Sequence, residues 1–189
     1  DPAWGAKKLL FLLEKQRNRG QDGAGISIVQ FKMPSCQKYF HTLKSADPNS
    51  LDQIARQVLD DIKLLKTSSH SLSSLEWKSQ SPYIGEVLLG HLRYATHSGL
   101  QLKYCQPFIR PHYIPKCQLA LAGNFNMTNT DELMQNLETL GFAFPIESDT
   151  QVILDKISYE LDRANEQTKA RLNPQLEIAS ILKKAAKDW

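Results

Sequence analysis

The sequence has no long apolar run and no targeting signal. Its richest apolar stretch, residues 9–13, is followed at once by Glu14 and Lys15, whereas a membrane-spanning helix needs about 18 consecutive apolar residues. Lys7 and Lys8 precede this stretch, but no small-residue cleavage site follows it, which argues against a secretory signal peptide. We therefore expect a cytoplasmic protein without a membrane partner.

Cysteine and histidine are too few and too scattered for a disulfide scaffold or a metal centre. The three cysteines, Cys36, Cys105 and Cys117, are odd in number and show no Cys-x-x-Cys spacing. His91 and His97 lie close in sequence but have no third ligand at a suitable spacing. We expect packed or incidental reduced thiols, no metal site and no cofactor in this domain.

Neither sign of charge is in large excess. The chain has 23 basic and 20 acidic residues, a net charge of +3, and the basic residues are spread along the sequence. Nucleic-acid-binding proteins usually concentrate basic residues on one face or helix, so no nucleic-acid partner is expected. The chain also lacks an internal repeat and a glycine-rich phosphate loop, and its 189 residues suit one domain.

Apolar spacing and capping residues predict helices and strands along the chain. Apolar residues three and four positions apart indicate helices, and runs rich in β-branched residues indicate strands. Helices are predicted at 3–18, 50–65, 130–140, 148–161 and 176–187, and strands at 25–31, 38–43, 85–94 and 118–122. The serine-rich residues 67–82 are predicted to form a long surface loop. Because strands precede helices without βαβ alternation, the pattern indicates an α+β fold.

The first segment with chemical potential is residues 17–25, which hold three glycines just before a predicted strand. Glycines at this density indicate a backbone that turns tightly or approaches another segment closely. Arg17 and Arg19 stand beside them, and arginine forks suit a carboxylate. The alternative is an ordinary connection between a helix and a strand.

The second segment is residues 90–99, in which Arg93 follows an apolar strand. A planar guanidinium at a strand end can hold a carboxylate at two points. Thr96, His97 and Ser98 add hydrogen-bond donors next to it. The alternative is a strand end whose arginine forms a surface ion pair.

Two further segments carry polar residues next to predicted elements. Residues 122–129 place asparagines and a glycine after an apolar strand, where amide groups and free backbone N–H groups suit an oxyanion hole. The alternative is an asparagine-rich turn. Ser148, Asp149 and Thr150 stand at a predicted helix start, where Asp149 either complements the helix dipole or binds a substrate ammonium.

Taken in order, these segments resemble one family, the class II (N-terminal nucleophile) glutamine amidotransferases. The similarity extends over roughly residues 9–161. Within the family, the first motif is most similar to the glutaminase domain of the amidophosphoribosyltransferase branch. The matching motifs are RGQDGAG at 19–25, GHLRYATHSG at 90–99, QPF at 106–108, GNFNMTN at 123–129 and SDT at 148–150.

The resemblance implies a fold and a reaction. The fold is a four-layer αββα sandwich, the N-terminal nucleophile hydrolase fold. The reaction is hydrolysis of glutamine to glutamate and ammonia, and the ammonia serves to make phosphoribosylamine from phosphoribosyl pyrophosphate in purine biosynthesis. The family's nucleophile is an N-terminal cysteine whose own α-amino group acts as the base.

The resemblance also implies roles for individual residues. Arg93 matches the arginine that binds the glutamine α-carboxylate, and Asp149 matches the acid that binds its α-amino group. Thr96 is expected in the wall of the substrate pocket.

Four residues match the catalytic surroundings. Asn124 matches the oxyanion-hole asparagine, and Phe125 stands where the family has a glycine that contributes a backbone N–H. Arg19 and Gly20 match the loop beside the nucleophile. The oxyanion hole therefore depends on whether Phe125 adopts the required backbone angles.

The chain departs from the family at its start. It begins with Asp1, whereas family members place an N-terminal cysteine segment ahead of the helix that is predicted here at 3–18. We expect a domain truncated at both ends, with the nucleophile segment upstream and a phosphoribosyltransferase domain downstream. Mg²⁺ with phosphoribosyl pyrophosphate is expected only in that downstream domain, and the family resemblance favours a homo-oligomer. As it stands, the chain is expected to be inactive alone.

Two alternatives to this function remain open. One is a non-catalytic, glutamine-binding regulatory module whose nucleophile is absent from the gene. The other is the glutaminase domain of a different glutamine-dependent transferase or synthase.

Overall fold

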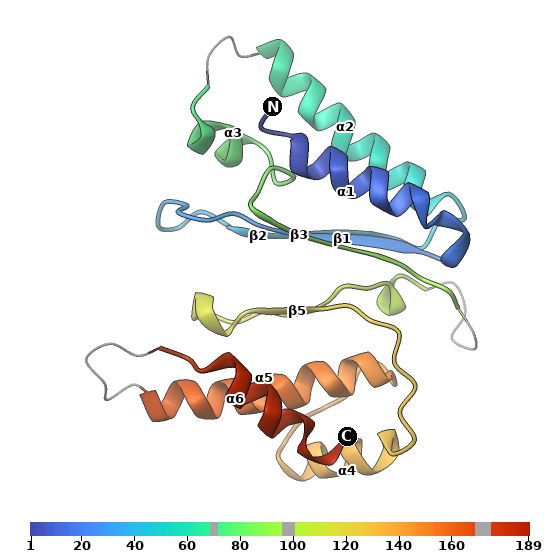
Figure 1. Ribbon diagram of the computed structural model, residues 1–189, viewed down its shortest axis with the longest axis vertical. Helices are drawn as coiled ribbons and strands as arrows, with labels where there is room; N and C mark the ends of the chain where they lie inside the picture. The colour runs from blue at the N-terminus through green and yellow to red at the C-terminus, as the bar shows by residue number, and fades with distance from the viewer. Residues whose placement is uncertain (69–71, 96–100, 169–174) are drawn as a thin grey trace. The chain divides into compact units, whose positions relative to one another are not determined.

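The computed structural model describes residues 1–68, 72–95, 101–168 and 175–189, which form two compact units (Figure 1). The first unit is Asp1–Pro107 and the second is Phe108–Trp189. Both combine helices with antiparallel strands, so the predicted α+β class is confirmed. Within the described residues, no helix is both long and apolar enough to cross a bilayer.

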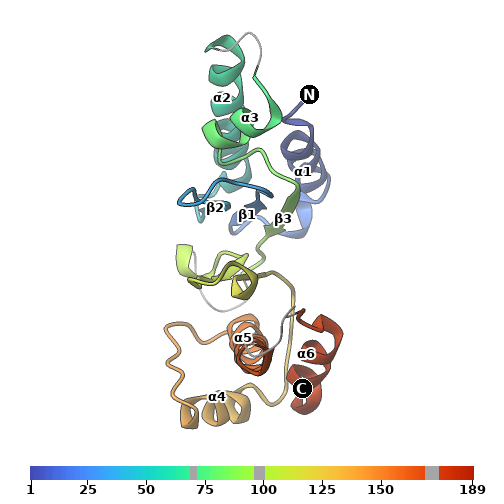
Figure 2. The same cartoon turned by 90° about the vertical axis from the view of Figure 1, so that its left-hand side faces the viewer.

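The first unit is a three-stranded antiparallel sheet covered on one face by helices (Figures 1 and 2). The strand order is β2-β1-β3, with β1 in the centre. Its elements are α1 (Trp4–Lys15), η1 (Arg17–Arg19), β1 (Ala24–Val29), β2 (Phe40–Ser45), α2 (Ser50–Ser68), α3 (Ser74–Gln80), β3 (Val87–Leu92) and η2 (Leu102–Tyr104).

Strand periodicity explains why α1 and α2 lie on the same face. Side chains of a strand alternate between faces, so Ala24, Ile26 and Ile28 of β1 all point into one core. There they meet apolar residues spaced three and four apart on the two helices. The helix residues of this core are Ala6, Leu10 and Leu13 of α1 and Leu51, Ile54, Val58 and Ile62 of α2.

The predicted loop at 67–82 is wrong over most of its length. Helix α2 continues to Ser68, and α3 occupies Ser74–Gln80. Ser73 caps α3: its Oγ accepts from the Glu76 N–H at 3.3 Å, and the Glu76 carboxylate accepts from the Ser73 N–H at 2.7 Å. This reciprocal pair is a capping box, a sequence signal that the serine-rich composition obscured.

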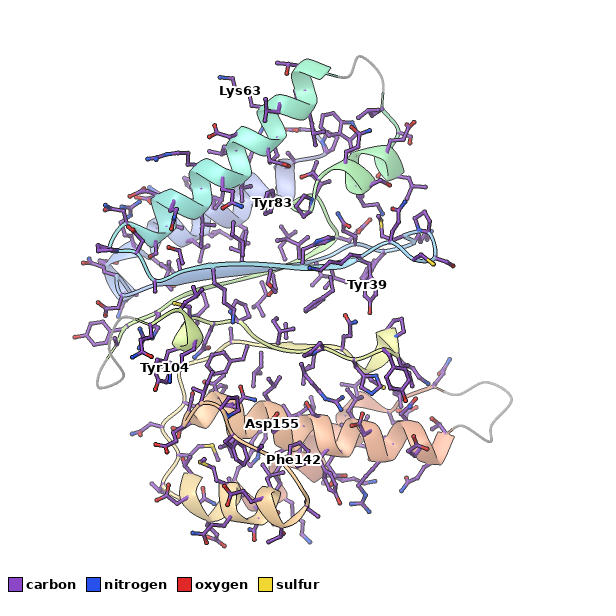
Figure 3. All side chains as sticks on the ribbon, turned by 180° about the vertical axis from the view of Figure 1, so that it is seen from behind. Tyr39, Lys63, Tyr83, Tyr104, Phe142 and Asp155 are labelled. Carbon is purple, nitrogen blue, oxygen red and sulfur yellow. The ribbon has the colours of Figure 1, made fainter. Side chains whose placement is uncertain are left out.

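The second unit is organised around one long helix. Its elements are β4 (Phe108–Arg110), η3 (Pro115–Cys117), β5 (Leu119–Leu121), α4 (Thr130–Thr139), α5 (Asp149–Thr168), α6 (Ile178–Ala185) and η4 (Ala186–Asp188). Helix α5 packs against the β4–β5 hairpin, α4 and α6. Phe142 lies edge-on to Tyr159 of α5, with ring centroids 6.2 Å apart (Figure 3). Strand β4, which pairs Ile109 with Ala120, was not predicted because it is too short to show a pattern.

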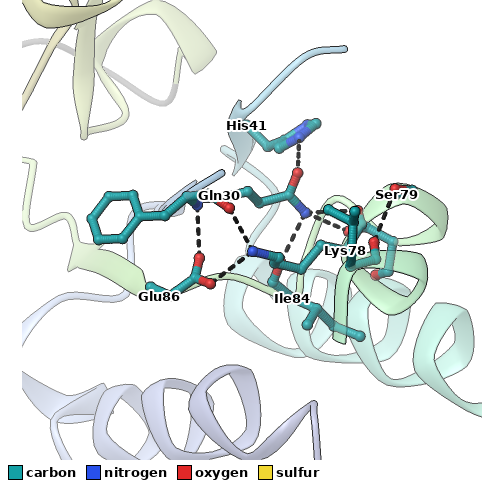
Figure 4. Close-up of polar contacts among 9 residues, drawn as sticks. Gln30, His41, Lys78, Ser79, Ile84 and Glu86 are labelled. Atoms are coloured by element: carbon teal, nitrogen blue, oxygen red, sulfur yellow. Dashed lines mark hydrogen bonds and ion pairs between the residues drawn. The ribbon is translucent and has the colours of Figure 1, made fainter. Parts of the chain in front are cut away.

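A buried polar side chain with several partners in the first unit is Gln30, just after β1 (Figure 4). Its amide nitrogen lies 2.9, 2.8 and 2.8 Å from the carbonyl oxygens of Lys78, Ser81 and Ile84. Its amide oxygen lies 3.0 Å from Nε2 of His41. Burial, and then the charge of Lys38, lower the pKa of His41, which leaves a neutral ring that donates to this oxygen. Gln30 therefore joins α3 and the segment after it to the sheet.

Replacing Gln30 with leucine is expected to lower the free energy of unfolding by about 2–4 kcal/mol, because buried carbonyl groups lose their donor. Urea denaturation followed by circular dichroism measures this change. Gln37→Leu is the matched control at an exposed glutamine, and its effect should stay within about 0.5 kcal/mol. Equal effects of the two substitutions would contradict the role of Gln30.

Candidate functional site

The glycine-rich segment lies directly against the end of β3. A Cβ atom added to Gly20 would lie 2.7 Å from the carbonyl carbon of Leu92 and 2.8 Å from that of Arg93. The φ of Gly20 is −168°, extended backbone that any residue adopts. Close approach of two backbones, not an unusual dihedral angle, therefore requires glycine here. The predicted close approach of this segment is confirmed.

Arg93 is held by this segment through its backbone. Its N–H donates to the carbonyl of Gly23 at 2.8 Å, and its carbonyl accepts from the N–H of Asp22 at 3.0 Å. These two bonds continue the β1–β3 ladder past its last strand pair, Ala24 opposite Leu92. Arg93 is only 5% exposed, so the alternative of a surface ion pair does not apply.

The side chain of Arg93 also has defined neighbours in the first unit. Its Nη1 lies 3.4 Å from the backbone carbonyl of Asp22. Its guanidinium carbon lies 5.5 Å from the centroid of the Tyr104 ring. The Asp22 carboxylate accepts from the N–H of Ala95 at 2.7 Å, which ties down the chain after Arg93.

Two basic residues on neighbouring strands, His91 and Lys44, are partly buried near Arg93. His91 and Lys44 stand opposite Gly25 on β3 and β2. Burial, and then the positive charge of Arg93, lower the pKa of His91, so its ring is neutral near pH 7. Burial also lowers the pKa of Lys44. An anion placed among these groups would be stabilised electrostatically.

Cys105 lies in the same region but is not poised as a nucleophile. Burial raises the pKa of its thiol, and the opposing effects of Arg93 and Lys44 are smaller. The S–H group donates to the carbonyl of Ser45 at 3.3 Å. Cys105 and Cys117 are both fully buried, while Cys36 is exposed. A protonated, buried thiol is inert, which agrees with the prediction that the buried thiols serve packing.

The two arginines near the glycines differ. Arg17 donates to the Asp52 carboxylate and also bonds Glu14, and these contacts raise its pKa. The carboxylate partner that we considered for this pair is therefore supplied to Arg17 by the protein itself. Arg19, in η1, is exposed.

In the second unit, Asp149 is the first residue of α5. One carboxylate oxygen accepts from the N–H of Met127 at 2.9 Å, and the other accepts from the Thr130 hydroxyl at 2.7 Å. Asp149 thus fixes the segment that follows Asn124. A carboxylate has about four acceptor positions, so two bonds leave capacity for a ligand ammonium.

Asn124 and Phe125 follow β5 and are both exposed. The Phe125 ring lies over Gly123, where an added Cβ would be 2.4 Å from ring atoms. In the described part of the chain, only Lys32 and Cys36 combine a side chain with a positive φ. Phe125 therefore does not adopt the left-handed backbone that glycine would permit.

The predicted site residues are thus distributed over the two units. Gly20 lies against Arg93 in the first unit, which also holds the exposed Arg19, whereas Asn124, Phe125 and Asp149 belong to the second. Thr96 lies outside the described residues. Sequence reasoning missed Asp22 and Tyr104, and only the aspartate stands inside a motif that could have drawn attention to it. In the described ranges, no three His, Cys, Asp or Glu side chains gather as metal ligands would.

Known proteins resemble this chain in sequence over most of its length. An amidophosphoribosyltransferase from Methanocaldococcus jannaschii is 29% identical over 168 residues, which are 89% of this chain and 29% of the relative. Amidophosphoribosyltransferase 2, chloroplastic, of Arabidopsis thaliana is 30% identical over 154 residues, which are 81% of this chain and 22% of the relative. No protein-family model matches the chain.

A solved structure resembles the fold. Glutamine phosphoribosylpyrophosphate (PRPP) amidotransferase from B. subtilis, complexed with ADP and GMP, superposes with a TM-score of 0.62 at 20% identity. The match covers 96% of this chain and 30% of that one. The chain therefore spans under a third of the length of these relatives. The predicted resemblance to amidophosphoribosyltransferases is confirmed.

Gly20→Ala is expected to lower the free energy of unfolding by about 1–3 kcal/mol, because the new methyl group meets backbone atoms that cannot move aside. Thermal or urea denaturation provides the measurement. Gly5→Ala is the control, since its methyl group meets chiefly the end of the Leu88 side chain and lies within α1. Alanine there should be neutral or stabilising by up to about 1 kcal/mol.

Proposed function

We propose that this chain is the glutamine-binding, glutaminase part of an amidophosphoribosyltransferase-like protein. The observation that carries the proposal is the placement of Arg93, which is nearly buried and bonded through its backbone to the glycine-rich segment. The sequence similarity to amidophosphoribosyltransferases supports it. In the whole protein, the released ammonia would serve phosphoribosylamine synthesis in purine biosynthesis.

Substrate recognition rests on the two charged groups that the α-carbon of glutamine carries. Arg93 binds the α-carboxylate of glutamine, because a buried guanidinium forms strong, charge-assisted bonds with a carboxylate. Asp149 binds the α-ammonium with the acceptor positions that Met127 and Thr130 leave over. Thr96 contributes to the pocket wall.

The reaction is an acyl transfer in two steps. A cysteine thiolate forms a bond to the side-chain amide carbon, and the tetrahedral oxyanion is stabilised by Asn124 and the backbone N–H of Phe125. The C–N bond then breaks, the nitrogen takes a proton and ammonia leaves. Water hydrolyses the thioester to glutamate and regenerates the thiol. Arg19 and Gly20 line the loop beside the nucleophile.

The 189 residues supply no suitable nucleophile, because Cys105 and Cys117 are buried and an internal cysteine has no α-amino group of its own. The chain alone is therefore proposed to bind glutamine without hydrolysing it. The N-terminal cysteine, the phosphoribosyltransferase domain and its Mg²⁺ with phosphoribosyl pyrophosphate belong to the whole protein. The four-layer sandwich, the cytoplasmic location and a homo-oligomeric state complete the proposal.

A second candidate is a glutamine-binding regulatory module without catalysis. It is favoured by Phe125, whose side chain stands at the proposed oxyanion hole and whose φ is not positive. A glutaminase assay on the whole gene product separates the two candidates. Glutamate release supports the enzyme, and binding without release supports the module.

Arg93→Ala is expected to weaken L-glutamine binding to this chain by about 10- to 100-fold, the equivalent of a lost charge-assisted bond. Isothermal titration calorimetry measures the Kd. Arg56→Ala, at an exposed arginine of α2, is the matched control and should leave the Kd unchanged. Wild-type affinity in the Arg93 variant, or no glutamine binding by the wild-type chain, would refute the proposed function.

Asp149→Asn keeps one oxygen for the Met127 N–H, and its amide nitrogen can donate to the Thr130 hydroxyl, but it removes the charge that an ammonium requires. We expect L-glutamine affinity to fall by about tenfold, in line with the loss of a charged hydrogen bond. Glutaramate, which is glutamine without its α-amino group, should bind the wild type and the Asp149→Asn variant equally. Asp131→Asn, at an exposed aspartate in the first turn of α4, is the control. An equal loss for both ligands would point to a structural role only.

A further inference from the structure

We propose that Tyr104 is a positioning residue that sets the Arg93 guanidinium for the α-carboxylate of the bound amino acid. This inference rests on the proposed function and adds a residue that none of the sequence motifs singled out. Tyr104, labelled in Figure 3, is the last residue of η2, and its ring centroid lies 5.5 Å from the guanidinium carbon of Arg93. That distance is within the range of a cation–π contact.

The ring restrains Arg93 in a way that another carboxylate would not. A guanidinium presents five N–H donors in its own plane. An aromatic ring attracts a guanidinium through its negative face without neutralising its charge, whereas a protein carboxylate would neutralise it. The carbonyl of Asp22, 3.4 Å from Nη1, adds a second, weak restraint. Together these two contacts restrain the orientation of the Arg93 side chain, and neither of them neutralises its positive charge.

Hydrogen bonds of the backbone and of Cys105 hold the segment that carries the Tyr104 ring against the first unit. The backbone N–H of Tyr104 donates to the carbonyl of Gln101 at 3.1 Å, and that of Cys105 donates to Leu102 at 3.0 Å. The buried Cys105 thiol bonds the carbonyl of Ser45, the last residue of β2. The sheet therefore positions Tyr104 through Cys105, just as it positions Arg93 through β3.

Lys103 places a second positive charge at the same ring. Its ammonium lies 4.9 Å from the centroid of the Tyr104 ring, so two cations contact one ring. Like charges held close together favour an anion between or beside them. The carboxylate of an amino acid that approaches Arg93 is attracted by these positive charges, whereas a ligand without a carboxylate is not.

The test compares L-glutamine binding to Tyr104→Leu and Tyr104→Phe in the 189-residue chain by calorimetry. Phenylalanine keeps the aromatic face, so its Kd should stay within about twofold of wild type, whereas leucine should weaken binding about 3- to 10-fold. L-Glutaminamide, which lacks the α-carboxylate, should bind the wild type and both variants equally. Tyr113→Leu, at a tyrosine that is 85% exposed, is the matched control and should change nothing.

A second series guards against misfolding of the leucine variant. Replacing Tyr104 with phenylalanines carrying progressively more fluorine atoms keeps the shape but weakens the negative ring face, and L-glutamine affinity should fall stepwise. Wild-type binding that is unaffected by leucine, or indifferent to fluorination, overturns the role of Tyr104 alone. Absence of L-glutamine binding in the wild-type chain overturns the proposed function and this inference with it.

Discussion

Much of the first unit depends on the pairing of Asp22 and Gly23 with the backbone of Arg93. Two hydrogen bonds, of 2.8 and 3.0 Å, extend the antiparallel ladder beyond the ends of β1 and β3. The ladder can continue only because Gly20 has no side chain, since its Cβ position lies against the backbone of Leu92 and Arg93. A loop that is glycine-rich in sequence thus acts as an extension of the sheet, and it holds an arginine at a defined depth.

This arrangement explains why a long, flexible side chain can serve as a precise contact. Arg93 would lose much rotamer entropy if a ligand alone had to order it. The backbone ladder, the Asp22 carbonyl and the Tyr104 ring order it beforehand, which would reduce the entropic cost of the proposed binding of a carboxylate. The nearby burial that keeps His91 neutral acts in the same direction, because weak solvation strengthens an ion pair with the guanidinium.

In the second unit, the residue that orders the neighbouring chain stands at the start of a helix and not at the end of a strand. Asp149 opens α5, and its carboxylate binds both the Met127 N–H and the Thr130 hydroxyl. One residue therefore orders the segment between β5 and α4 in which Asn124 and Phe125 stand. The interpretation of Asp149 as a helix-start residue is compatible with its proposed binding of an ammonium group, since the local bonds use only part of its acceptor capacity.

The sequence by itself determined the α+β class, most helices and strands, and the resemblance to amidophosphoribosyltransferases, because periodicity, capping and ordered motifs are local properties. It also indicated that the backbone near Gly20 either turns tightly or approaches another segment closely. It misjudged Ser74–Gln80, where a capping box outweighs serine-rich composition, and it missed β4, which is too short to show alternation. Only the tertiary structure decided which backbone Gly20 touches, that Asp52 engages Arg17, and that Tyr104 faces Arg93. Those contacts join residues far apart in the chain, and their geometry depends on strand register and packing, which no local pattern encodes.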